Sequence, residues 1–290
     1  MSDVRSPTLR RRELGARLRA LRLEKGLTVD QVAELLLCSP SKVSRMETGQ
    51  RGATPRDIRD LSGIYGVTDQ AQVAYMTELA KEGKQQGWWQ SHDLDFAAYV
   101  DLEQAAMATS YYQSSIVPGL LQTVGYMRAM YSGGLPGEIT PERADELMTV
   151  RFRRQEILTR ETPLPLHTIL DEAVLHRVIG GGATMAGQLR HLKAVASRPS
   201  VTLQVLPYAA GAHPAMDNMF NILEFDVVPP VVYVEGLMGW LYIERESEVA
   251  RYQQIFEYLQ NIALDPQETI ALLSEIAVEY GSADLTVMNP

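Results

Sequence analysis

The sequence has almost no cysteine and no long apolar run. Cys38 is the only cysteine among 290 residues, so the chain can form neither an internal disulfide nor a cysteine-rich metal site. No apolar stretch approaches the roughly 20 residues that a membrane-spanning helix needs, and the first five residues lead into a basic helical pattern instead of an apolar signal segment. We therefore expect a cytoplasmic protein that is neither exported nor embedded in a membrane.

Motifs of catalysis and metal binding are also lacking. The five histidines (His92, His167, His176, His191 and His213) are scattered without the spacing of a zinc site, and no serine or cysteine has the surroundings of a nucleophile elbow. Gly180-Gly181-Gly182 has neither the G-x-G-x-x-G spacing nor the Gly-Lys-Ser/Thr ending of a phosphate loop, so we interpret it as a connection between helices. The sequence predicts no enzyme, no metal and no cofactor.

Positive charge is scarce overall but concentrated at the N-terminal end. The net charge is -9, yet residues 1–66 hold 13 Lys+Arg against 8 Asp+Glu, a balance of +5, which leaves -14 for the rest of the chain. The length suggests about two domains. A small basic module ahead of an acidic body indicates that only the first part approaches a polyanion, because salt screens more distant phosphate attraction. Chance clustering of arginines is the alternative interpretation.

The first 80 residues predict five short helices. Leu14, Leu18 and Leu21 form an apolar stripe on the first. Thr28 and Gln31 have capping-box spacing at the start of the second, and Ser39-Pro40 and Thr54-Pro55 begin the third and fourth. The expected helices cover residues 9–25, 29–36, 40–48, 55–65 and 69–80. This region, residues 1–80, is the predicted DNA-binding domain.

Residues 81–87 are polar, contain two glycines and form the predicted linker. Residues 88–290 then mix helical and strand-like patterns, which predicts one α+β domain with a small sheet. Its helices are expected at 96–112, 120–131, 141–160, 171–179, 184–197, 247–263 and 266–280, and its strands at 166–170, 201–206, 219–225, 231–235 and 240–244.

The second and third helices have the spacing of a helix-turn-helix. Val43 and Met46 share the face of the third helix that can be buried, which turns its small hydroxyl and cationic side chains outward. Small hydroxyls let a helix enter a major groove deeply, and Lys and Arg reach base edges or phosphates. The predicted DNA contacts are Thr28, Gln31, Ser39, Ser41, Lys42, Ser44, Arg45, Gln50 and Arg51. The alternative is that these are solvated residues on a helical bundle.

Six residues of the acidic domain are candidates for a ligand or partner site. Aromatic side chains close in sequence to Pro-Gly and Gly-Ala-His-Pro loops could form an apolar cavity with a few polar points. Two adjacent tryptophans follow the linker, and one of them could dock the DNA-binding module or cap a pocket. The candidates are Trp88, Trp89, Tyr111, Tyr112, Pro118 and His213. Ordinary core and turn roles are the alternative.

Residues 14–66, and above all the run SPSKVSRMETG, resemble the lambda-repressor-like helix-turn-helix domain of XRE-type transcriptional regulators. The runs GWWQ (87–90), VPGLLQT (117–123), RQEILTR (154–160), VLPYAAGAHPAM (205–216) and VYVEGL (232–237) resemble the C-terminal domain of actinobacterial Scr1-family antitoxin-like regulators. The sequence departs from the XRE pattern at Val29, where many members have Gln, and at Leu37, where the turn often has Gly.

The resemblance implies a nucleoid-associated, sequence-specific transcriptional regulator. Its third helix would read the major groove of a double-stranded DNA operator, and its C-terminal domain would serve dimerisation and the sensing of a small-molecule effector or a partner. A homodimer would place two third helices about one DNA turn, roughly 34 Å, apart. The alternative is an antitoxin-like interaction protein that sequesters a small partner protein and regulates its own operon.

Overall fold

The computed structural model describes residues 6–85, 87–92, 96–133, 139–236 and 238–287. The chain divides into two compact units, one made of Met1–Ala105 with Phe225–Val228 and the other of Ala106–Glu224 with Pro229–Pro290. The expected linker, residues 81–87, falls within the first unit, and its Gln86 lies outside the described residues. The first five residues and Leu237 of the VYVEGL run also lie outside them.

The first unit begins with the five short helices that the sequence predicts. The helices of this unit are α1 (Pro7–Glu24), α2 (Val29–Leu35), α3 (Pro40–Glu47), α4 (Pro55–Tyr65), α5 (Gln70–Glu82), the 3-10 helix η1 (Trp88–His92) and α6 (Ala97–Ala105). A side-chain oxygen caps the N-terminus of each of α1 to α5, contributed in order by Ser6, Thr28, Ser39, Thr54 and Asp69. The caps recognised in the sequence explain why α2, α3 and α4 begin where predicted, whereas α1 begins two residues before the expected Leu9, after the cap Ser6.

One apolar core joins α1 to α5. It is formed by Leu14, Leu18, Val32, Ala33, Val43, Met46, Ala53, Ile58, Leu61, Tyr65, Met76, Leu79 and Ala80. Every one of the five helices contributes a buried side chain, so their packing is mutual. The fold class predicted for this part of the chain is confirmed.

The second unit is built on a six-stranded sheet. Its strands are β1 (Ala108–Gln113), β2 (Leu166–Asp171), β3 (Val201–Leu206), β4 (Phe220–Glu224), β5 (Val231–Gly236) and β6 (Gly239–Ile243), arranged in the order β3-β2-β1-β4-β5-β6. β1, β2 and β3 are parallel, whereas β4, β5 and β6 continue the sheet by antiparallel pairing. The carboxyl ends of the three parallel strands therefore meet at one edge of the sheet.

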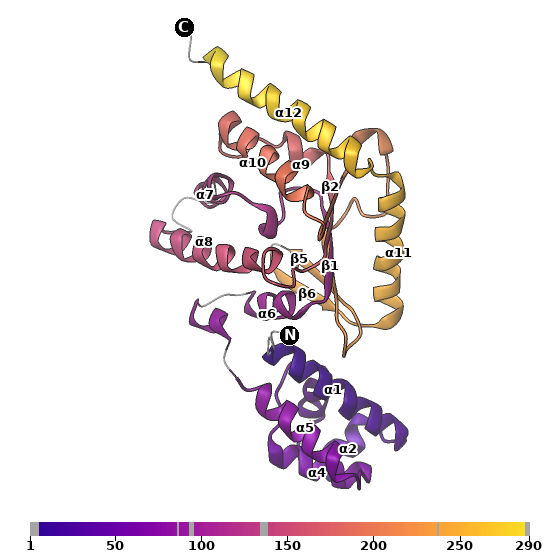
Figure 1. The fold of residues 1–290 in the computed structure, drawn as a ribbon. Coiled ribbons are helices and arrows are strands. Elements are labelled where there is room, and N and C mark those ends of the chain that lie inside the picture. Colours follow the sequence, from indigo (N-terminus) through magenta and orange to yellow (C-terminus); the bar gives the residue numbers. More distant parts are fainter. Residues whose placement is uncertain (1–5, 86, 93–95, 134–138, 237, 288–290) are drawn as a thin grey trace. The chain divides into compact units, whose positions relative to one another are not determined.

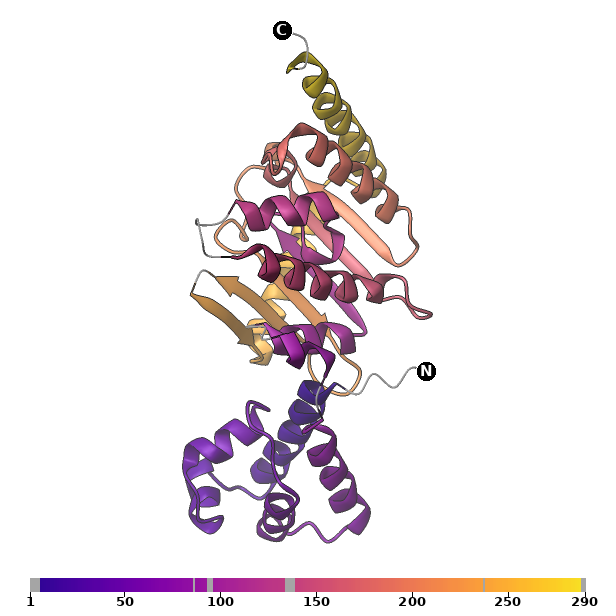
Figure 2. The same cartoon turned by 90° about the vertical axis from the view of Figure 1, so that its left-hand side faces the viewer.

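Helices cover both faces of this sheet, as Figure 1 shows. The helices and 3-10 turns of the unit are η2 (Gly119–Leu121), α7 (Val124–Ser132), α8 (Pro141–Gln155), η3 (Glu156–Leu158), α9 (Ala173–His176), α10 (Gly181–Ala196), η4 (Tyr208–Ala210), α11 (Glu246–Ile262) and α12 (Pro266–Val287). Phe256 and Leu259 of α11 belong to the same apolar cluster as Ile222 and Val232 of the sheet. α7 and α8 lie on the opposite face, in front of the strands in Figure 2. The unit is thus an α+β domain, as predicted.

The predicted helix over residues 96–112 is wrong in its second half. The helix α6 ends at Ala105, and the chain then forms β1, which lies between β2 and β4. Thr109, Tyr111 and Tyr112 are residue types that favour strands, and all three are buried. Because β1 is covered on both faces, its sequence lacks the alternation that identifies a strand with one exposed face. The five predicted strands correspond to β2 to β6.

No helix in the described part of the chain is both long enough and apolar enough to cross a membrane.

The turn between α2 and α3 contains a strained residue. Leu37 has a φ of 52°, and it is the only residue other than glycine with a positive φ in the described part of the chain. This left-handed conformation costs an L-residue with a Cβ roughly 1–2 kcal/mol. The Leu37 side chain is 93% exposed, so it gains little from burial in return. The departure from Gly at this position is therefore a local cost in stability.

We expect Leu37→Gly to stabilise the first unit by about 1 kcal/mol, because glycine adopts this conformation without strain. Leu35→Gly is the matched control: Leu35 is also exposed but, as the last residue of α2, has the right-handed helical conformation, so glycine there should destabilise the helix instead of stabilising it. Amide hydrogen exchange of peptides from residues 6–85 measures both free energies. A loss of stability in Leu37→Gly would contradict the assignment of strain to this turn.

Candidate nucleic-acid interface

α3 is held against α1 by direct backbone contact. Val43 and Met46 bury one face of α3, with only 1% and 2% of their surfaces exposed. On the α1 side the contact falls at Gly15, where a Cβ would lie 2.5 Å from the carbonyl oxygen of Glu47 and 2.6 Å from that of Met46. No side chain fits between the two helices there, so Gly15 lets α1 support the C-terminal end of α3.

A buried ion pair fixes the same end of α3. Arg22 of α1 donates from Nε to Oε1 of Glu47 at 2.7 Å and from Nη2 to Oε2 at 2.8 Å, and its Nη1 donates to the carbonyl oxygen of Leu27 at 2.9 Å. Both charged side chains are almost fully buried. The hydrogen bonds to Glu47 raise the pKa of Arg22, which therefore stays charged. Arg22 thus connects α1, α3 and the segment that leads into α2.

Lys42 is placed differently from its expected outward position. Its Nζ donates to Oδ1 of Asp57 at 2.6 Å, and only 24% of its side chain is exposed. Asp57 also belongs to the capping box of α4, where its Oδ2 accepts from the backbone N–H and the hydroxyl of Thr54. Burial acts to raise the pKa of Asp57, but the hydrogen bonds from Lys42 and Thr54 outweigh it and hold that pKa below its usual value. Lys42 therefore joins α3 to α4.

The outward face of α3 matches the prediction at its other positions. Ser41, Ser44 and Arg45 are exposed, as are Gln50 and Arg51 just beyond the helix. The Nε of Arg45 donates to the carbonyl oxygen of Ser41 at 3.3 Å, which directs the guanidinium along the helix. The face therefore combines two small hydroxyls with a cation, a composition that suits a groove lined by bases and phosphates.

The three predicted contacts at helix starts are exposed but also act as caps. Thr28 accepts from the backbone N–H of Gln31, and the Gln31 side chain accepts from the backbone N–H of Thr28 at 2.8 Å. The hydroxyl of Ser39 accepts from the backbone N–H of Lys42. Each of these three side chains retains a donor, so capping α2 and α3 leaves them able to bond a phosphate oxygen.

Sequence reasoning missed the residues that position α3. They are Gly15, Arg22, Glu47 and Asp57. One signal was present: Arg22 lies four residues after Leu18 and so falls on the apolar stripe of α1. A cation on a buried stripe needs an anionic partner, although the stripe alone does not show which carboxylate supplies it.

The two tryptophans lie in the first unit and have different surroundings. Trp89 is buried, whereas Trp88 is partly exposed and donates from Nε1 to Oε1 of Gln104 on α6 at 3.1 Å. Their rings meet edge to face with centroids 5.9 Å apart. The pair therefore has packing contacts of its own within the first unit.

The structure brings together two of the remaining candidates, Tyr112 and His213. The hydroxyl of Tyr112 lies 3.4 Å from Nε2 of His213, and Asp171 Oδ2 lies 3.9 Å from the same nitrogen. Burial, and then the Asp171 carboxylate, raise the pKa of Tyr112 above its usual value. The backbone N–H of Ala215 donates to His213 Nδ1 at 3.3 Å, so the ring proton of a neutral His213 is on Nε2. This cluster attaches the loop after β3 to the carboxyl ends of β1 and β2.

Tyr111 and Pro118 are not part of that cluster. Tyr111 precedes Tyr112 in β1, so its side chain projects from the opposite face of the sheet. Pro118 is buried in the segment that leads into η2, where its carbonyl oxygen accepts from the backbone N–H of Leu121. Both have core surroundings.

The VPGLLQT and RQEILTR runs bond to each other. Gln155 of the second run donates to the carbonyl oxygens of Gly119 and Gln122 in the first, both at 2.9 Å. Gln188 of α10 accepts from the backbone N–H of Thr123 and donates to the carbonyl oxygen of Leu121. These amides bond backbone groups of the segment between β1 and α7, so both runs have a structural role. The described residues contain no group of three or more His, Cys, Asp or Glu side chains that could hold a metal ion.

We expect Glu47→Gln to destabilise the first unit by about 3 kcal/mol, because it leaves the Arg22 guanidinium buried without a counter-charge. Glu34→Gln removes the same charge from an exposed position on α2 and should change the stability by less than about 0.5 kcal/mol. Amide hydrogen exchange in α1 and α3 measures the difference. Equal effects of the two substitutions would show that the ion pair does not hold α3.

The pair of Lys42 and Asp57 predicts a pH dependence. The pKa of Asp57 is lower in the folded chain than in the unfolded chain. The ionised Asp57 therefore stabilises the fold fully at a pH above its pKa in the unfolded chain, and this stabilisation is lost as the pH falls through its pKa in the folded chain. Asp57→Asn should therefore be less stable than the natural chain at pH 7, and the two should converge as the pH falls below about 3.8. Urea unfolding at a series of pH values tests this. A difference that persists unchanged at pH 2 would contradict it.

Comparison with known families assigns both parts of the chain. Residues 13–76 match a helix-turn-helix domain, which supports a DNA-binding regulator in general. No match was found among curated proteins or among solved structures. Residues 96–275 match a domain of unknown function (DUF5753), and this match covers more than half of the chain. The chain therefore belongs to the family defined by that domain, here preceded by a helix-turn-helix domain.

Proposed function

We propose that the chain is a sequence-specific transcriptional regulator of the XRE type that inserts α3 into the major groove of an operator. The observation that carries the proposal is the division of α3 into an anchored face and a free face. Val43, Met46 and Glu47 hold the helix against α1, while Ser41, Ser44 and Arg45 remain exposed. A reading surface needs side chains that are free at their tips and fixed at their backbone.

The exposed side chains divide into two kinds of contact. Arg45 can form a bidentate contact with a guanine, and Ser41 and Ser44 can bond base edges or phosphates without keeping the helix out of the groove. Gln50 and Arg51, which follow α3, suit the flanking phosphates, as do the capping side chains at the starts of α2 and α3. Lys42 has a smaller role in this proposal, because its ammonium group already neutralises Asp57.

The second unit has the regulatory role in this proposal, and the chain has no enzymatic activity. A homodimer would present two copies of α3 to a two-fold operator, and the second unit would provide dimerisation and the sensing of an effector or a partner. The similarity of its sequence runs to Scr1-family regulators supports this division of labour, with the protein at the nucleoid in the cytoplasm. The antitoxin-like alternative predicts that a small partner protein co-purifies with the chain.

We expect Arg45→Ala to weaken binding to the operator by about 1–3 kcal/mol while leaving non-specific binding nearly unchanged, because a base contact is lost and the phosphate contacts remain. Genomic footprinting first identifies the operator, and fluorescence anisotropy at fixed salt then measures the affinity for it and for a scrambled duplex. Arg19→Ala is the matched control, since it removes the same charge from an exposed position on α1. Operator affinity that is unchanged in Arg45→Ala, or reduced equally in both variants, would exclude α3 as the reading helix.

A further inference from the structure

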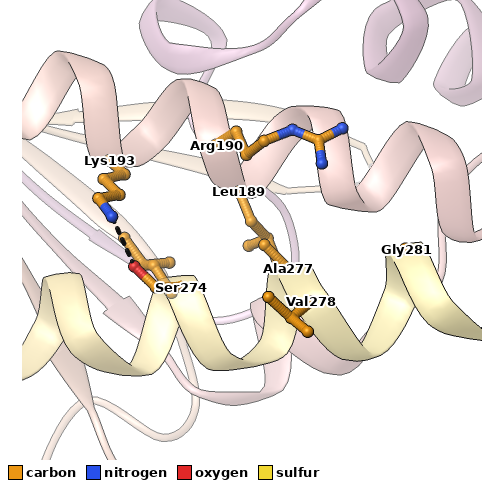
Figure 3. Close-up of a pocket in the computed structure, with 8 residues that line it drawn as sticks. Leu189, Arg190, Lys193, Ser274, Ala277, Val278 and Gly281 are labelled. Carbon is orange, nitrogen blue, oxygen red and sulfur yellow. Dashed lines mark hydrogen bonds between the residues drawn. The ribbon is translucent and has the colours of Figure 1, made fainter.

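A groove lies on the surface of the second unit between α10 and α12, and Figure 3 shows its lining. It has a volume of about 270 Å³ and is lined by Leu189, Arg190, Lys193, Leu273, Ser274, Ala277, Val278 and Gly281. The floor is largely apolar, and Val278 is 70% exposed. Lys193 donates from Nζ to the hydroxyl of Ser274 at one end, while the Arg190 side chain extends along the groove toward Gly281.

The two helices that form the groove carry opposite charges. α10 contains Arg190 and Lys193 and no acidic residue, whereas α12 contains four acidic residues and no Lys or Arg. Arg190 and Glu275 are both exposed, and neither has a hydrogen-bond or ion-pair partner among the described residues. The groove therefore offers an apolar floor beside an unpaired cation.

The exposed side of α12 has the complementary character. Glu275, Val278, Glu279 and Ser282 are all exposed. Glu275 lies three and four residues before Val278 and Glu279, and Ser282 lies four and three residues after them, so the four side chains form one ridge along the helix. The ridge presents an apolar side chain between carboxylates. A groove that pairs an apolar floor with a cation is the surface that such a ridge would fit.

We propose that the groove binds the same ridge of a second copy of this chain, with the two α12 helices antiparallel about a two-fold axis near Val278. In that arrangement Arg190, whose side chain points toward the Gly281 end of the groove in Figure 3, meets Glu275 of the second copy, because Gly281 and Glu275 lie three residues to either side of Val278. The contact then occurs twice, as the symmetry of an isologous dimer requires.

Gly281 supports a close approach of a second helix at this point. Glycine inside a helix costs stability relative to alanine, and a Cβ at Gly281 would have no neighbouring atom within 4 Å, so packing within the chain does not require glycine here. The open space on this side of α12 can accept the backbone of another helix.

The inference deepens the proposed function, since it rests on the dimer that a two-fold operator needs, but its test contains no DNA. A monomeric chain with an intact α3 would overturn this interface and leave the reading helix in place. A dimeric chain whose Arg45→Ala variant binds the operator normally would overturn α3 as the reading helix and leave the dimer interface in place. The two proposals can therefore fail separately.

The experiment exchanges the charges of Arg190 and Glu275 in the full chain. Arg190→Glu and Glu275→Lys each place like charges together twice in a homodimer. We expect each repelling contact to weaken the dimer about tenfold, so that each variant raises the dimer dissociation constant about a hundredfold. Mixing the two variants should restore a dimer, because both contacts of the heterodimer then pair opposite charges. Sedimentation velocity over a range of concentrations measures all of these, and circular dichroism checks that each variant is folded.

Arg251→Glu and Glu257→Lys are the matched controls, since they make the same charge changes at exposed positions on α11, and both should remain dimers. Monomeric natural chain at all concentrations, or single variants that dimerise as tightly as the natural chain, would overturn the proposal. Dissociated variants that fail to recover on mixing would overturn the pairing of Arg190 with Glu275. A groove occupied instead by a helix of another protein would leave the natural chain monomeric.

Discussion

The position of α3 depends on one buried ion pair, formed by Arg22 and Glu47. Burying two charges costs desolvation energy that their attraction repays only when the geometry is good, so such a pair is weak evidence for overall stability. Its effect here is on position. The two-pronged contact fixes both the distance and the rotation between the helices, whereas apolar residues of the same size would allow α3 to slide on α1. Together with the backbone contact at Gly15, it makes the free face of α3 a rigid surface.

The same constraint separates the two cations of α3. Lys42 and Arg45 are three residues apart and look alike in a sequence. Lys42 donates to the carboxylate of Asp57 on α4, whereas Arg45 donates, among the described residues, only to a backbone carbonyl of its own helix. One cation therefore contributes to the internal structure, and the other remains available to a ligand. The position of the acidic capping residue of α4 decides which cation is paired inside the domain and which remains exposed. That position depends on tertiary packing, which helical periodicity does not predict.

Local signals predicted the fold of the first unit well, because each helix start has a capping side chain and most of the ends have a glycine nearby. Local signals gave the wrong prediction where tertiary packing determines the secondary structure. β1 was expected to be helical, since a strand buried on both faces lacks the alternation that marks a half-exposed one. Tyr112 and His213 were expected in one candidate site, but the part of Asp171 was not predicted for a related reason: it depends on parallel strands aligning their carboxyl ends, and no short-range pattern encodes that alignment.

The polar residues in and near the sequence runs of the second unit form hydrogen bonds within that unit. The glutamines Gln122, Gln155 and Gln188 bond the backbone of the segment before α7, and His213 attaches the loop after β3 to the sheet. Polar side chains that satisfy buried backbone groups cannot turn outward without leaving those groups unpaired, at a cost of about 1–3 kcal/mol each. A partner of this unit must therefore be recognised by other residues. Among these the ridge and groove of α10 and α12 stand apart, because their charges are exposed and Arg190 and Glu275 have no partner among the described residues.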